Sequence, residues 1–171
     1  MIAQGFIDAF APWKTLYGDS PVVATTVTTV HVVALLFGGG FALATDRSTL
    51  RALRGSSDDR RRQLAELHAV HRPVLVALAM IFVSGLALAT ADLETFLGSP
   101  VFWVKLALVT LLVANGALLA RTEARLLRSP TAPATTTDHS PLWRRLRFST
   151  FASITLWTLT TIAGTALVGL S

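Results

Sequence analysis

Four long apolar segments, separated by polar connections, dominate the chain. The first has no charged residue before Asp46. About 25 residues at 1.5 Å each reach roughly 37 Å, enough to cross the ~30 Å hydrocarbon core of a bilayer with some tilt. The pattern predicts an all-α integral membrane protein, an up-down bundle of four helices forming a single domain over 1–171. The predicted crossings are residues 21–45, 73–91, 101–120 and 148–170.

The first twenty residues show a helical pattern of another kind. One apolar stripe that ends in Trp and Tyr is typical of an amphipathic helix in the headgroup region. We therefore expect a short interfacial helix over 1–20, kinked at Pro12, with a frayed terminus as the alternative. The segment lacks the basic start and the cleavage site of a signal peptide. The stripe consists of Ile2, Phe6, Phe10, Trp13 and Tyr17.

Basic residues are concentrated in alternate connections. Of the 15 Lys and Arg residues, seven lie between the first and second segments and six between the third and fourth. The connection 92–100 has none. The positive-inside rule then puts the two basic connections in the cytoplasm and both termini outside, which suits a bacterial inner membrane.

The two basic connections differ in structure. The first should contain a helix that is capped by Ser57, starts at Asp58 and ends near Pro73. The second contains residues 129–141, rich in Pro, Ser and Thr, which predict a flexible cytoplasmic linker carrying His139.

Composition narrows the class of protein further. The chain is 52% hydrophobic and has no cysteine, which excludes disulfides, thiolate metal sites and iron–sulfur clusters. The net charge of +5 comes from arginines that flank apolar segments, so we do not expect nucleic acid as a partner. The expected partners are the lipid bilayer and either a second copy or other membrane proteins.

One histidine, His31, lies near the middle of the first apolar segment. A titratable imidazole is costly in lipid, so it should face other helices, a cavity or a ligand. Counting from the helix ends places Lys105 at a similar depth, together with Leu88 and Ala163. Asp92 and Glu94 lie above this level, so an outward-facing polar pocket is one interpretation. In the alternative, His31 bonds a nearby threonine and Lys105 reaches to the outer interface.

Two further histidines, His68 and His71, are three residues apart. This spacing is compatible with two ligands of one metal on one helical face, or with an interfacial amphipathic face. A b-type haem would need His31 with Met80, His31 alone, or His31 from two copies, because His71 lies about 20 Å away in depth. Since the sequence shows no nucleophile–base pair, phosphate loop or catalytic carboxylate pair, we do not expect an ordinary hydrolase or kinase.

Short motifs between Thr25 and Arg128 resemble a known family. A histidine precedes the run Gly38-Gly39-Gly40, Ser84-Gly85 lies in the second segment, and Gly98-Ser99-Pro100 leads to Lys105. This arrangement resembles the four-helix module of the copper-resistance-D proteins of bacterial inner membranes. The resemblance implies a role in copper handling, with His31 as a ligand.

Two classes of function follow. In the first, the protein handles a metal or redox cofactor, copper or a b-type haem, through His31. In the second, it is a non-catalytic accessory subunit that packs its threonine- and glycine-rich faces against partners in a membrane complex.

Overall fold

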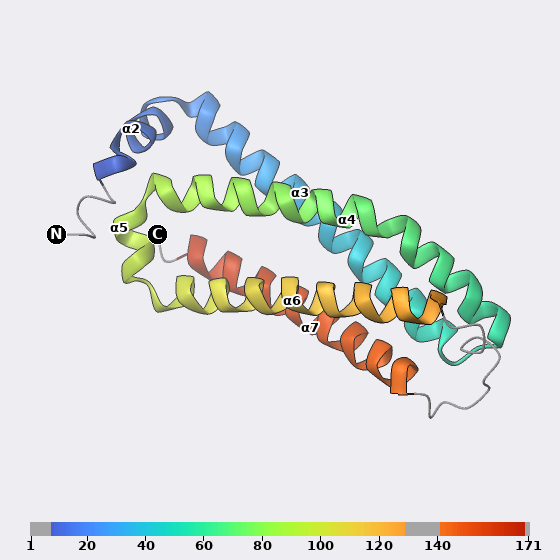
Figure 1. The fold of residues 1–171 in the computed structure, drawn as a ribbon. Coiled ribbons are helices and arrows are strands. Elements are labelled where there is room, and N and C mark those ends of the chain that lie inside the picture. Colours follow the sequence, from blue (N-terminus) through green and yellow to red (C-terminus); the bar gives the residue numbers. More distant parts are fainter. Residues whose placement is uncertain (1–7, 129–140, 170–171) are drawn as a thin grey trace.

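The computed structural model describes residues 8–128 and 141–169, and every element in this part of the chain is an α-helix (Figure 1). The four longest, α3, α4, α6 and α7, are long and apolar enough to cross a membrane. This confirms the predicted all-α class and its four apolar helices. The elements are α2 (Ala11–Asp19), α3 (Pro21–Ala52), α4 (Ser57–Ala91), α5 (Leu93–Gly98), α6 (Pro100–Arg128) and α7 (Pro141–Val168).

The four long helices pack mainly as two pairs. The helix α3 lies along α4, α6 lies along α7, and α3 also packs against α7, whereas α4 and α6 contact each other only sparsely. The end of α3 and the start of α4 lie at one end of the molecule, with the end of α6 and the start of α7 (Figure 1). We call this the arginine-rich end, and the opposite end, which carries α2 and α5, the hairpin end.

The N-terminal helix α2 folds back onto the hairpin end of α4. The indole Nε1 of Trp13 donates to the carbonyl of Ala87 at 2.8 Å. Helical residues 8–9 are followed by a turn at Phe10, and Pro12 lies in the first turn of α2, where a proline gives up no hydrogen bond within the helix. Residues 1–7 of the predicted interfacial segment lie outside the described residues, as do residues 129–140 of the predicted linker.

The second long helix corrects two predictions. It is capped by Ser56, one residue before the predicted Ser57: the Ser56 hydroxyl accepts from the Asp59 N–H, and the Asp59 carboxylate accepts from the Ser56 N–H. These bonds hold the pKa of the Asp59 carboxyl below its usual value. The helix also does not end near Pro73 but continues through it to Ala91. A proline removes only one backbone hydrogen bond of a long apolar helix. Packing against neighbouring helices keeps the segments before and after the proline continuous.

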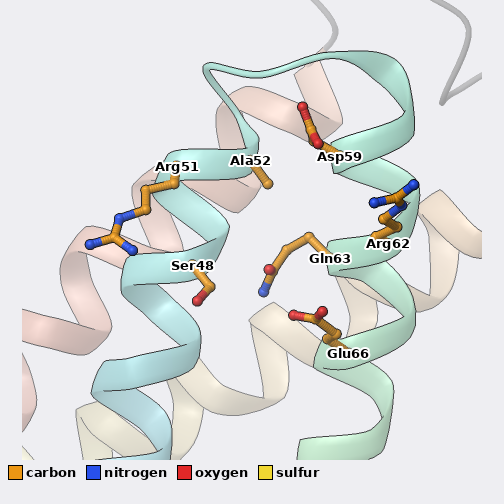
Figure 2. Close-up of a pocket in the computed structure, with 7 residues that line it drawn as sticks. All are labelled: Ser48, Arg51, Ala52, Asp59, Arg62, Gln63 and Glu66. Carbon is orange, nitrogen blue, oxygen red and sulfur yellow. The ribbon is translucent and has the colours of Figure 1, made fainter.

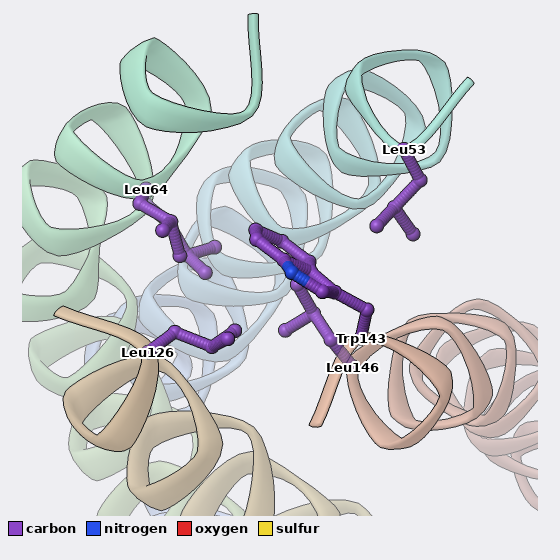
Figure 3. Close-up of a cluster of buried hydrophobic side chains, with 6 residues drawn as sticks. Leu53, Leu64, Leu126, Trp143 and Leu146 are labelled. Carbon is purple, nitrogen blue, oxygen red and sulfur yellow. The ribbon is translucent and has the colours of Figure 1, made fainter. Parts of the chain in front are cut away.

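A cluster of large apolar side chains holds the arginine-rich end together (Figure 3). All four long helices contribute to it, and the Trp143 ring lies among the leucines. The guanidinium of Arg60 lies 5.6 Å from the centre of that ring and donates to the Leu53 carbonyl at 3.0 Å. The members are Leu53, Leu64, Leu67, Leu126, Trp143 and Leu146.

Small residues let the helices approach closely in the middle of the molecule. A Cβ added at Gly38 would lie 2.9 Å from the Cβ of Ala77 on α4. A Cβ added at Gly39 would lie 3.4 Å from the ring of Trp157 on α7. The close approach of α3 to both neighbours therefore depends on these two glycines, whereas Gly40 has nothing within 4 Å.

We expect Gly38→Val to lower the free energy of unfolding by about 1–3 kcal/mol, because the added side chain forces α3 and α4 apart. Equilibrium unfolding of the purified protein in detergent measures the change. Gly40→Val is the matched control and should be nearly neutral. An equal loss in the two variants would contradict the close α3–α4 contact.

Several hydroxyl groups of α7 bond the backbone of their own helix, as expected for hydroxyls in apolar helices. Thr150, Thr158 and Thr161 each donate to the carbonyl four residues earlier, at 2.9 Å. Thr160 differs, because its buried hydroxyl has no hydrogen-bond partner among the described residues.

Candidate functional site

The candidate site is built around His31, which is 9% exposed inside the bundle. Its Nδ1 lies 2.9 Å from the hydroxyl of Ser84 on α4. That hydroxyl has one proton and donates it to the carbonyl of Met80, at 2.5 Å. In the tautomer that satisfies both contacts, the Ser84 oxygen accepts from His31 and Nδ1 carries the imidazole proton. The lone pair of the neutral ring is then on Nε2, the atom that is left to accept a proton or bind a ligand.

The surroundings of His31 come from the other three long helices. A Cβ added at Gly85 of α4 would lie 3.2 Å from the His31 Cε1, so the glycine leaves room for the ring. Lys105 of α6 interacts electrostatically with His31. The Lys105 ammonium lies against Gly164 of α7, where an added Cβ would be 3.5 Å from Nζ. We call His31, Ser84, Gly85 and Lys105, with Gly164 next to the Lys105 ammonium, the His31 centre.

Counting from the helix ends located this centre only in part. The position on α7, Gly164, is next to the predicted Ala163. On α4 the neighbours are Ser84 and Gly85, about one turn from the predicted Leu88, because α3 runs obliquely to α4 (Figure 1). The partner of His31 is Ser84 and not a threonine of its own helix. Glu94 lies away from the centre, with its carboxylate 3.5 Å from the ammonium of Lys14.

Met80 enters the site only through its backbone. Its carbonyl accepts from Ser84, while its side chain is among the exposed large hydrophobic groups of α4. Ligation of one haem by both residues would require the Met80 thioether and His31 to face the same site. The described contacts do not bring these two side chains together.

The two histidines at the arginine-rich end do not form a described metal site. His68 is 76% exposed, and its Nδ1 lies 3.2 Å from a carboxylate oxygen of Glu123 on α6. The side chain of His71 lies outside the described residues. Within the described part of the chain, no group of three or more His, Asp or Glu side chains is placed to hold a metal ion. Sequence reasoning missed Glu123, which is 55 residues from His68 and whose register depends on how α4 packs on α6.

A cavity of about 400 Å³ opens at the arginine-rich end, between the end of α3 and the start of α4 (Figure 2). Gln63 and Glu66 point across it toward Ser48, whereas the guanidinium groups of Arg51 and Arg62 point outward on either side. The amide of Gln63 also donates to Thr49 at 3.1 Å. This cavity lies at the arginine-rich end of α3, away from the His31 centre.

Replacing Ser84 by alanine should remove the acceptor that fixes the His31 tautomer. We expect the free energy of unfolding to fall by about 0.6–2 kcal/mol, the range of one interhelical hydrogen bond between apolar helices. The proton should then populate both ring nitrogens, which nitrogen NMR of the imidazole detects. Thr110→Ala is the matched control, because Thr110 donates only to its own helix, at Leu106. A ring tautomer unchanged in Ser84→Ala would contradict the assignment.

Comparisons of the chain with protein families, with curated proteins and with solved structures find no match.

Proposed function

We propose that the protein is a multi-pass protein of a bacterial inner membrane whose four long helices cross the bilayer as an up-down bundle. In this arrangement the arginine-rich end faces the cytoplasm and both termini lie outside. The proposal is supported by the length and apolar character of the four helices and by the 13 basic residues of the two alternate connections.

Cysteine labelling tests this topology, because the natural chain has no cysteine. We expect an impermeant thiol reagent to label Thr95→Cys, in α5, from outside intact cells. Arg54→Cys, between α3 and α4, should react only after the membrane is opened. Both positions are exposed, so the pair is matched in accessibility. Labelling of Arg54→Cys in intact cells would overturn the orientation.

Within this membrane protein, we propose that the His31 centre holds a redox cofactor, a b-type haem, with Nε2 of His31 as the iron ligand. The observation that carries the proposal is the contact of Nδ1 with Ser84, which leaves Nε2 as the ring nitrogen that can bind a ligand. A hydrogen bond from the second ring nitrogen is the usual way in which proteins orient a histidine ligand. A haem bound there would supply electron transfer.

Haem fits the donor set better than the copper implied by the resemblance to copper-resistance-D proteins. Copper would find one imidazole nitrogen, an exposed Met80 side chain and the repelling charge of Lys105. A haem needs only one axial nitrogen from the chain, and the Lys105 ammonium suits a propionate carboxylate. His31 is buried and lines neither described cavity, so a haem within one chain or between two copies would require the helices around His31 to move apart.

The second candidate function, a non-catalytic accessory subunit, is favoured by a separate observation. Hydrogen bonds that involve side chains link α3 to α4 and α6 to α7. The Asn115 amide of α6 donates to the Ser149 carbonyl of α7 at 2.9 Å, and the Ser149 hydroxyl donates back to the Asn115 side chain at 2.9 Å. In this alternative, the His31–Ser84 bond is the corresponding tie between α3 and α4.

Metal analysis of the purified protein separates these functions. The haem proposal predicts iron that remains with the protein through purification, in a ratio approaching one per chain. Copper in that ratio would support the function implied by the resemblance. A colourless, metal-free protein recovered with a larger complex would support the accessory subunit.

A further inference from the structure

A buried carboxyl group near the arginine-rich end is separate from the His31 centre. Asp46 follows the first predicted crossing directly and is only 2% exposed. Its oxygen Oδ2 is buried and has no hydrogen-bond partner among the described residues. The hydroxyl of Ser153 on α7 lies beside the carboxyl and interacts with it. One hydroxyl is a weak substitute for the water that an ionised carboxylate would lose on burial.

No counter-charge is placed to balance an ionised Asp46. Within the described residues, its interactions include no Lys, Arg, His or second carboxyl group, only its burial and the Ser153 hydroxyl. The neighbouring Arg47 is exposed, and the buried Glu123 of α6 bonds His68. Burial strongly disfavours an ionised carboxylate that has no positive partner. The buried group is therefore stable only with a proton or another cation bound to it.

Asp46 lies near the cavity at the arginine-rich end. Thr49 lies one turn further along the same face of α3 and is also buried. Its hydroxyl accepts from Gln63, and Gln63 lines the cavity of about 400 Å³ at the arginine-rich end (Figure 2).

We propose that Asp46 is a proton-binding site of the bundle, near the cavity at the arginine-rich end. A proton is the ligand that the geometry favours over a metal cation. The hydroxyl of Thr49 already donates to the Thr45 carbonyl and accepts from Gln63, so it is largely occupied. This leaves few free oxygen ligands for a metal ion, whereas a proton needs none. The site does not depend on what His31 binds.

Infrared spectroscopy of the purified protein in lipid vesicles tests the proposal. A protonated carboxyl has a distinct C=O stretch, which the ionised form lacks. We expect this band to persist at a pH where exposed carboxyls are ionised, to disappear in Asp46→Asn, and to remain in Asp59→Asn. Asp59 is the matched control, because it lines the same cavity but is exposed. A spectrum that is the same in wild type and Asp46→Asn would overturn the proposal.

Two further measurements test whether the infrared band arises from protonated Asp46. Ser153→Ala retains the carboxyl and removes the hydroxyl that interacts with it, so the band should shift. An unshifted band would show that it does not arise from Asp46 and would overturn the proposal even if Asp46→Asn does not fold. Replacing choline chloride by sodium chloride at constant pH should leave the band unchanged. Loss of the band in sodium would assign the site to that ion and overturn proton binding.

Discussion

Replacing Trp143 by alanine should lower the free energy of unfolding by about 3–5 kcal/mol, the usual cost of removing a buried aromatic side chain. Trp143 is 3% exposed and packs among leucines of all four long helices (Figure 3). Its loss would leave a cavity at the place where α3, α4, α6 and α7 meet. It would also remove the ring over which the Arg60 guanidinium lies. Equilibrium unfolding in detergent measures the change.

The matched control for this prediction is Leu127→Ala. Leu127 is next to the buried Leu126 but is 50% exposed, so its truncation should cost less than about 0.5 kcal/mol. A small loss in Trp143→Ala, similar to that of the control, would mean that this cluster does not hold the four helices together.

The second large effect is expected for His31→Gln, which should abolish cofactor binding while the bundle still folds. Glutamine keeps a hydrogen-bonding group of similar size, so the free energy of unfolding should fall by only about 0.6–2 kcal/mol. Its amide, however, is a poor replacement for an imidazole nitrogen as an iron ligand. The cofactor content and the stability of the same preparation measure the two effects separately.

Controls for His31→Gln come from the other histidines. His139→Gln, in residues outside the described structure, should change neither cofactor content nor stability. His68→Gln removes an exposed ring at the arginine-rich end, away from the His31 centre, and should leave the cofactor content unchanged. A cofactor that survives His31→Gln and disappears in a His68/His71 double variant would move the chemistry to the arginine-rich end.

The hydrophobic pattern predicted the elements of the fold because burial of apolar surface acts along the whole length of each helix. Four long apolar runs can form few other structures. Within this fold, Gly38 and Gly39 let α3 approach Ala77 and Trp157 closely. Pro73 misled the prediction, because its local preference to end a helix is weaker than the packing of a long apolar helix.

The partners of the polar residues could not be predicted from the sequence in the same way. A side chain chooses its partner by the rotation and crossing angle of the helices, which no local pattern encodes. His31 and Ser84 are 53 residues apart, and His68 and Glu123 are 55 apart. Asp46 marked the end of an apolar run in the sequence, and only the packing of α7 against α3 shows that it is buried without a counter-charge.

A haem titration of the purified protein, followed by absorption, tests the role of His31 most directly. The account predicts a Soret band that shifts on binding and saturates at one haem per chain, and that His31→Gln abolishes this saturable change. Absorption that rises without saturation, or that is the same in wild type and His31→Gln, would contradict it.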